Sequence, residues 1–257
     1  MKKYLDHIGK KSKKAVLKSV NTEKKNKVLL DFAILIKKNE KNIIKQNKKD
    51  ISFAIKKGLK KNMIERLILD KIKIKQIENS IKKIVNLKDP VDKIIKKWKR
   101  PNGLRFKKVT IPIGVIGIIY ESRPNVTSDV SCLCFKSGNA VILKGGSEAF
   151  NSNKTLVNLF RKALIKNNID PNYVQLIEKR NRQVVNYMLT KMKEYIDVII
   201  PRGGKGLVKE VQKKSAVPFI GHLEGICHTY VDKSANMNMA KKIILNAKLR
   251  NTAICGA

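Results

Sequence analysis

The sequence predicts an α/β fold in which N-terminal helices precede a mostly parallel sheet with helices on both faces. Three observations lead to this prediction. Through residues 1–100, apolar residues recur at near-helical spacing between lysines. After residue 100 they gather into short continuous runs, and segments of helix length separate these runs. Short buried strands that alternate with helices are typical of β-α-β units, whose parallel strands are covered on both sides.

Residues 1–100 are expected to form a helical segment that packs on the rest of the chain. Asn21-Thr22-Glu23 has the composition of a helix start, Gly58 favours a break, and Asp89-Pro90 favours a stop. In the second part we expect strands at residues 111–120, 140–143, 173–177 and 196–200. Helices are expected between or after them, at residues 126–136, 149–166, 182–191 and 204–213.

The chain has 257 residues and a formal net charge of +37, from 57 Lys and Arg against 20 Asp and Glu. Such a charge suits a binder of nucleic acid or another polyanion. However, Lys supplies 48 of the basic residues and Arg, which phosphate and base recognition favour, only 9. A compositionally biased surface is the favoured interpretation, and nucleic-acid or polyanion binding is the alternative.

The hydropathy of the sequence excludes further classes of protein. Hydrophobic residues make up 42% of the chain, enough for a sizeable core, which excludes wholesale disorder. The apolar stretch at residues 109–120 is too short to cross a bilayer, and no apolar region follows the basic N-terminus as it would in a signal peptide. We therefore expect a cytoplasmic protein without a membrane partner.

The four cysteines are Cys132, Cys134, Cys227 and Cys255. They form no C-x-x-C pair and no zinc-ligand spacing with histidines, so we expect reduced thiols and no metal. Cys255 follows a helix-like segment and precedes a glycine, which suits an exposed, reactive thiol in a loop. A buried, unreactive cysteine is the alternative.

Polar residues follow the first predicted strand of the sheet, at the edge where parallel α/β sheets bind ligands. Arg123 and Asn125 lie there, next to Pro124 and the start of a predicted helix. An Asn amide in this position can donate to a developing oxyanion. Asn is also a common helix cap, so capping is the alternative.

Two further strand ends carry residues suited to a nucleotide. Lys144 follows strand 140–143 and precedes two glycines, which suits a ribose or a phosphate. Gly203 and Gly204 follow strand 196–200 and precede a helix, whose free N–H groups can bind phosphate. A surface lysine and a tight turn are the respective alternatives.

Together, five segments resemble one known family, the γ-glutamyl phosphate reductases (glutamate-5-semialdehyde dehydrogenases) of the aldehyde dehydrogenase superfamily. The similarity follows the family's order along the whole chain. Its strongest motifs are YESRPNVT at residues 120–127, NAVILKGG at 139–146, IPRGGKGL at 200–207, GHLEGICHTYVD at 221–232 and NAKLRNTAIC at 246–255.

The resemblance implies a fold, a reaction and a cofactor. The fold is a Rossmann-type cofactor domain of the aldehyde dehydrogenase kind, at residues 101–247, preceded by the helical segment. The reaction is NADPH-dependent reduction of γ-glutamyl phosphate to glutamate 5-semialdehyde and phosphate, a step of proline biosynthesis. A homo-oligomer is implied for the full-length form, and no specific nucleic-acid partner.

The resemblance also implies roles for single residues. Cys255 matches the nucleophile that forms a thioester, and Asn125 the oxyanion donor. Lys144 matches the lysine at the adenosine ribose, and Gly203 and Gly204 match the loop against the cofactor. Arg123 is assigned, by position, to an anionic group of the substrate.

Two departures from the family accompany these assignments. Aldehyde-oxidising relatives place a general-base glutamate near Glu224, but a reductase that releases phosphate needs no activated water in that step, so Glu224 is left out of the catalytic set. The family continues past the position of residue 257. Residues 248–257 are therefore expected to begin a catalytic domain that is otherwise missing, and this fragment is expected to bind NADP(H) weakly without turnover.

Overall fold

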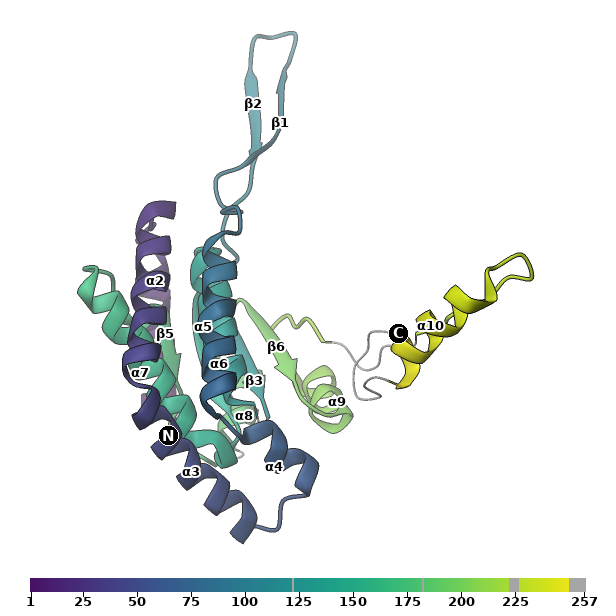
Figure 1. The fold of residues 1–257 in the computed structure, drawn as a ribbon. Helices are drawn as coiled ribbons and strands as arrows, with labels where there is room; N and C mark the ends of the chain where they lie inside the picture. The colour runs from purple at the N-terminus through teal and green to yellow at the C-terminus, as the bar shows by residue number, and fades with distance from the viewer. Residues whose placement is uncertain (122, 182, 222–226, 250–257) are drawn as a thin grey trace.

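The computed structural model describes residues 1–121, 123–181, 183–221 and 227–249 (Figure 1). In this part of the chain the predicted α/β fold is confirmed: N-terminal helices pack on a parallel sheet that helices cover on both faces. No helix among the described residues is long and apolar enough to cross a membrane.

Five helices form most of the N-terminal segment. Asn21 caps the second of them, because its side chain accepts a hydrogen bond from the Lys24 backbone N–H at 2.9 Å, as the predicted helix start requires. Gly58 follows the third helix with a φ of +71°, which suits the predicted break. The bounds are α1 Lys2–Val16, α2 Thr22–Lys38, α3 Glu40–Lys56, α4 Lys61–Leu67 and α5 Lys71–Val85.

The prediction that residues 1–100 are helical is wrong at their end. Strands β1 (Ile94–Lys99) and β2 (Arg105–Val109) form an antiparallel hairpin that projects from the body of the molecule (Figure 1). Trp98 pairs with Phe106, and their rings stack with centroids 5.1 Å apart. All strand residues of the hairpin are exposed. Its sequence therefore lacks the alternation of apolar and polar residues by which a half-buried strand is predicted.

Four parallel strands form the central sheet in the order β5-β4-β3-β6. The first is shorter than predicted: it begins at Val115, because Pro112 and Gly114 interrupt the extended run, and Ile111 and Ile113 lie exposed before it. The strands are β3 Val115–Tyr120, β4 Ala140–Gly145, β5 Val174–Leu176 and β6 Val198–Arg202. The remaining helices are α6 Pro124–Lys136, α7 Phe150–Lys166, α8 Gln183–Lys191, α9 Lys205–Lys214 and α10 Met237–Leu249, with short 3-10 turns at Ser147–Ala149 and Pro171–Tyr173.

Side-chain contacts place helices on opposite faces of this sheet. Tyr120 on β3 shares a hydrogen bond with Thr127 of α6, with 2.7 Å between the two hydroxyl oxygens. Gln175 on β5 donates to the Ile8 carbonyl of α1, also at 2.7 Å. Gln175 pairs with Ile142 of β4, and Tyr120 pairs with Gly145, which lies three residues further along the same strand. Because side chains alternate along a strand, Tyr120 and Gln175 point to opposite faces.

A buried carboxylate ties the helical segment to the sheet domain. Asp50 of α3 is 1% exposed and accepts hydrogen bonds from the backbone N–H groups of Asn151 and Ser152 at 3.0 and 2.7 Å. These N–H groups belong to the first turn of α7 and have no acceptor within that helix. One carboxylate therefore satisfies the start of α7 from a neighbouring helix and fixes α3 against it.

Candidate active site at the carboxyl edge of the sheet

The residues singled out after β3, β4 and β6 all lie where these parallel strands end. Register pairs Tyr120 with Gly145 on one side and with Arg202 on the other, so the three strands finish level with one another. Arg123, Lys144 and Gly203 follow or complete these strand ends. The structure therefore brings the candidate residues within the described ranges to one edge of the sheet, where the sequence predicted them.

Asn125 is not the cap of helix α6. Arg123 holds the N-cap position, Pro124 is the first helical residue, and Asn125 is the second. The Asn125 side chain is exposed and lines a cavity together with Asp129, one helical turn further on. Its amide thus points along a pocket, where it can donate to a ligand, and the capping alternative does not describe it.

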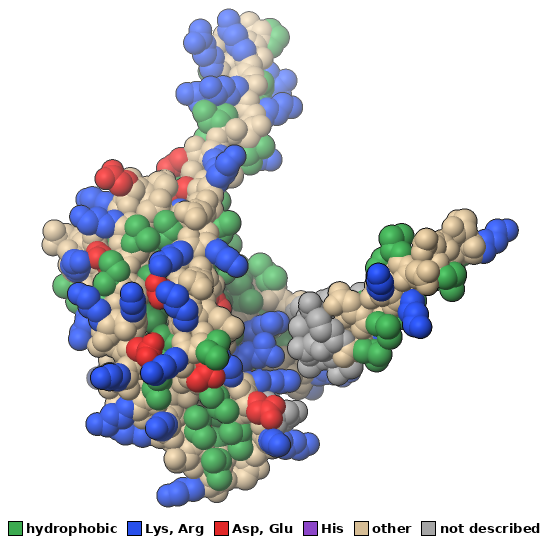
Figure 2. All heavy atoms as spheres, in the orientation of Figure 1, with side chains coloured by type: hydrophobic (Ala, Val, Ile, Leu, Met, Phe, Trp, Pro, Cys, Tyr) green, Lys and Arg blue, Asp and Glu red, His purple; other side chains and the backbone are tan. Residues whose placement is uncertain are grey.

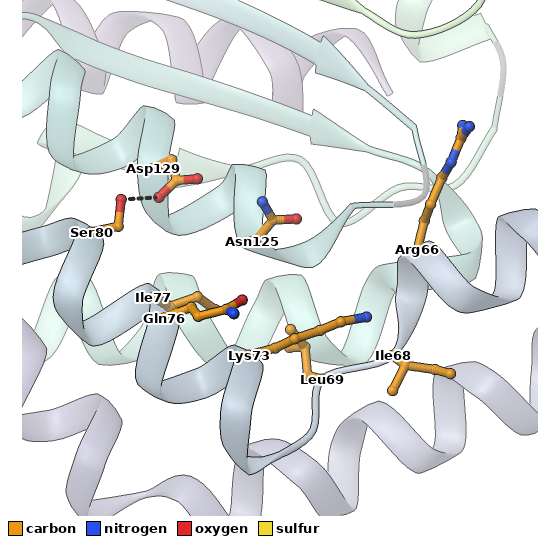
Figure 3. A pocket seen from close by; sticks show the side chains of 9 residues that line it. All are labelled: Arg66, Ile68, Leu69, Lys73, Gln76, Ile77, Ser80, Asn125 and Asp129. Atoms are coloured by element: carbon orange, nitrogen blue, oxygen red, sulfur yellow. Dashed lines mark hydrogen bonds between the residues drawn. The ribbon is translucent and has the colours of Figure 1, made fainter. Parts of the chain in front are cut away.

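That pocket has a volume of about 290 Å³ and lies between α4, α5 and α6. Figure 3 shows its nine lining side chains, with Asn125 between Asp129 and Arg66. Ser80 of α5 donates to Asp129 with 3.1 Å between the oxygens. Lys73 of α5 donates to the Glu65 carbonyl at 2.9 Å and extends along the same pocket. The space suits a small polar molecule rather than a polymer.

Arg66 of the pocket lies close enough to Arg123 to influence its charge, as does Arg202. Burial lowers the pKa of Arg123, and the positive charges of Arg202 and Arg66 lower it further. The three arginines come from three separate places in the chain: the end of β6, helix α4 and the N-cap of α6. Because mutual repulsion disfavours such a grouping, the site is prepared for an anion.

Lys144 lies at the end of β4 and is 8% exposed. Its ammonium donates to the Gly145 carbonyl at 2.9 Å, which leaves two N–H groups for other acceptors. Burial lowers the pKa of Lys144, and the negative charge of Glu148 acts in the opposite direction. A lysine held in this way is a positioned cation, unlike the solvated lysines that cover the visible face of the molecule (Figure 2).

The loop between β6 and α9 contains glycines, which let other groups come close to its backbone. A Cβ at Gly203 would lie 2.7 Å from the Glu121 carboxylate and 2.9 Å from Leu207, so a larger residue there would require these side chains to move. Gly204 is the N-cap of α9, and the space around Gly206 in the first turn is open. The backbone N–H of Gly204 donates to the Glu121 carboxylate, so the start of α9 already holds an anionic group.

The cysteines divide into two groups. Cys132 and Cys134 are buried in α6, and burial raises the pKa of both thiols, that of Cys134 to about 12. They are therefore poor nucleophiles at neutral pH. Cys227 is half-buried. Cys255 and Glu224 lie outside the described residues, within which no group of three His, Cys, Asp or Glu side chains could hold a metal.

Comparison with known proteins identifies the fold family. Residues 3–255 match the aldehyde dehydrogenase family. The chain belongs to this family. Aldehyde dehydrogenases use nicotinamide cofactors, in agreement with the loop after β6. More distant solved members, such as a probable aldehyde dehydrogenase of Listeria monocytogenes at 19% identity and a TM-score of 0.66, share the fold.

Within the aldehyde dehydrogenase family, the chain is similar to γ-glutamyl phosphate reductases along its whole length, as the motifs predicted. The Clostridium tetani protein of this name is 46% identical over 100% of the chain and 60% of its own length. The crystal structure of the Thermotoga maritima protein has a TM-score of 0.93 and 39% identity, over 98% of this chain and 61% of the other. That of the Saccharomyces cerevisiae protein has a TM-score of 0.77 at 34% identity, over 96% of this chain and 63% of the other. The chain thus spans about 60% of the length of the curated relatives it matches.

Five polar residues of the pocket were not predicted from the sequence: Arg66, Lys73, Gln76, Ser80 and Asp129. Arg66 and Lys73 stand among 57 basic residues, and neither belongs to a recognisable motif. Asp129 lies just past the motif at residues 120–127, four positions after Asn125, which places both side chains on the same side of a helix. That spacing is the one signal that could have identified it.

Proposed function

We propose that the protein formed by this chain reduces γ-glutamyl phosphate to glutamate 5-semialdehyde and phosphate, with NADPH as the reductant. The observation that carries the proposal is that Arg66 shares a pocket with Asn125 and interacts electrostatically with Arg123, in a chain of the aldehyde dehydrogenase family. An acyl phosphate needs this combination: cations for the phosphate and a hydrogen-bond donor for the acyl oxygen. The similarity to named reductases supports the same substrate.

Cys255 is the proposed nucleophile. Its thiolate attacks the acyl carbon, a C–S bond forms, and phosphate leaves with the electrons of the C–O bond to give a thioester. The Asn125 amide donates to the acyl oxygen as negative charge develops on it. Arg123 holds the phosphate, and its charge stabilises the leaving group. When bound, NADPH would supply a hydride to the thioester carbon. The resulting thiohemiacetal anion would collapse to the aldehyde and release Cys255 as its thiolate.

The cofactor is proposed to lie across the ends of β4 and β6. Lys144 would bind the adenosine ribose and the 2′-phosphate that distinguishes NADPH from NADH, because a buried ammonium gains most from a dianion. Gly203 and Gly204 would let the backbone meet the pyrophosphate at the start of α9. Residues 101–247 would then be the cofactor domain, residues 1–100 a segment that packs on it, and residues 248–257 the start of a catalytic domain.

The remaining proposals concern the setting of this reaction. The protein is placed in the cytoplasm, where thiols stay reduced and proline biosynthesis has its substrates. A homo-oligomer is proposed for the whole enzyme. The alternative, polyanion binding, gains no support from the surface in Figure 2, where lysines are interspersed with apolar side chains rather than gathered in a stripe.

The reaction is tested in reverse, as phosphate-dependent formation of NADPH from NADP⁺ and glutamate 5-semialdehyde, on the polypeptide in its native length. Activity should require phosphate and fall by at least about 10³-fold in Cys255→Ala. Cys227→Ala is the matched control and should keep its activity, because that thiol has no assigned role. Activity that survives Cys255→Ala would exclude the thioester route.

A further inference from the structure

Asp129 is the acidic residue of the pocket between α4, α5 and α6. It lies half-buried on α6 and lines the pocket beside Asn125. Ser80 donates a hydrogen bond to it, yet no Lys or Arg of the described ranges forms an ion pair with it. Burial raises the pKa of Asp129, and the polar side chains of Ser80 and Asn125 lower it only in part.

Other buried carboxylates are satisfied by the chain itself. Glu78 pairs with Lys75 and Lys82, and Asp31 pairs with Lys166. Asp50 accepts backbone N–H groups and a serine hydroxyl. Asp129 differs from these carboxylates in that it faces an open pocket.

The pocket around Asp129 is polarised. Figure 3 shows Asp129 and Ser80 at one end and Arg66 at the other, with Asn125 between them. A carboxylate that accepts one hydrogen bond, from Ser80, keeps acceptor capacity for further donors. The matching ligand carries a cationic group at one end, an anionic group at the other and a polarisable oxygen in the middle.

We propose that Asp129 binds the α-ammonium group of the amino-acid substrate, while the acyl phosphate lies toward the arginines at the opposite end. The assignment rests on the proposed function, because γ-glutamyl phosphate carries an ammonium group at one end of its chain and a phosphate at the other. Ser80 orients the carboxylate through its hydroxyl. Asp129 thereby selects an α-amino acid over an acid of equal length without the amine.

Selection of this kind has a physical basis. An ammonium that reaches Asp129 forms a charge-assisted hydrogen bond in a half-buried place, where it is stronger than in water. A substrate without the amine leaves the carboxylate desolvated and unpaired, which weakens its binding. The same pocket therefore attracts one molecule and disfavours its close analogue.

The first experiment measures binding and does not depend on catalysis. Calorimetry at about 150 mM salt compares L-glutamate with glutarate, which differs by the α-amino group alone. L-glutamate should bind at least about tenfold more tightly, and Asp129→Asn should remove that difference. Glu210→Gln, which removes an exposed carboxylate of α9, is the matched control and should preserve it. Equal affinities in the unsubstituted protein, or no binding of either compound at about 10 mM, would overturn the proposal.

The second experiment separates recognition from positioning of Asn125. With glutamate 5-semialdehyde, Asp129→Asn should lower kcat/KM about 100-fold. With 5-oxopentanoate, which lacks the amine, kcat/KM should change less than about threefold. Equal losses on both aldehydes would mean that Asp129 acts through Asn125, and would overturn the proposal. If the unsubstituted protein oxidises neither aldehyde, the proposed reaction fails, while the binding comparison still decides the role of Asp129.

Discussion

The backbone N–H of Gly204 donates a hydrogen bond to the carboxylate of Glu121, with 3.0 Å between Gly204 N and Glu121 Oε2. Glu121 directly follows strand β3, and Gly204 is the N-cap of α9. The carboxylate therefore occupies the helix terminus that the proposed function gives to the pyrophosphate of NADP(H). Since both groups are anions, they compete for the same N–H and the same positive end of the helix dipole.

Glu121→Gln should therefore tighten NADP⁺ binding. The amide oxygen can still accept from Gly204, but the competing charge is gone, and a charge at a helix terminus is worth about 0.3–1 kcal/mol. This corresponds to an affinity gain of about two- to fivefold, measurable by calorimetry. Glu210→Gln, which removes a carboxylate from the last turns of α9, should not raise the affinity. Weaker binding by Glu121→Gln would show that the carboxylate helps the cofactor.

Lys144→Met should reduce the preference for NADPH over NADH. The substitution keeps the length of the buried side chain and removes the ammonium that is assigned to the 2′-phosphate. The Kd for NADPH is expected to rise about tenfold or more, and that for NADH less than about threefold. Lys214→Met removes an exposed lysine and serves as the control. A similar loss for both nucleotides would place Lys144 at a part of the cofactor that they share.

Asp50→Ala should destabilise the fold strongly. It leaves the N–H groups of Asn151 and Ser152 and the Ser152 hydroxyl without their acceptor in a buried place. The expected loss is about 2–4 kcal/mol of unfolding free energy, measured by urea denaturation. The exposed pair of Glu210 and Lys214 provides a contrast, because Glu210→Gln should cost less than about 0.5 kcal/mol.

Stability should fall in acid partly through Glu78. Hydrogen bonds from Lys82 and Lys75 lower the pKa of this carboxyl from 4.5, although burial acts in the opposite direction. A carboxyl whose pKa is lower in the folded state stabilises the fold above its unfolded pKa, near pH 4.5, and loses this contribution as the pH falls through the folded value. Glu78→Gln should flatten the dependence of unfolding free energy on pH below pH 4.5. An unchanged slope would contradict the assignment.

Periodicity predicted the sheet domain well because most of its elements are buried on one face or on two. Helices α6 to α9 and strands β3 to β6 begin and end within a few residues of the predicted bounds. The β1–β2 hairpin was missed because it is exposed on both faces, so burial left no pattern in its sequence. Its Lys and apolar residues occur in short runs that continue the composition of the preceding helices.

The candidate site could be predicted only where motifs carry it. Arg123, Asn125 and Lys144 stand in motifs at strand ends, and the structure brings those ends together. Arg66 joins them through the packing of α4 near the start of α6, a tertiary relationship that no local pattern encodes. Asp129 can be recognised as a candidate only from the structure, because the sequence does not show that no lysine of the described residues forms an ion pair with it.

The β1–β2 hairpin has a further consequence. Trp98 and Phe106 stack on each other, outside the core that protects the sheet. A two-stranded ribbon is marginally stable in water, so its backbone amides are shielded by its own ladder alone. Their exchange with deuterium should follow the opening of the ribbon rather than the unfolding of the domain, and should be complete long before the amides of β3 and β4 exchange.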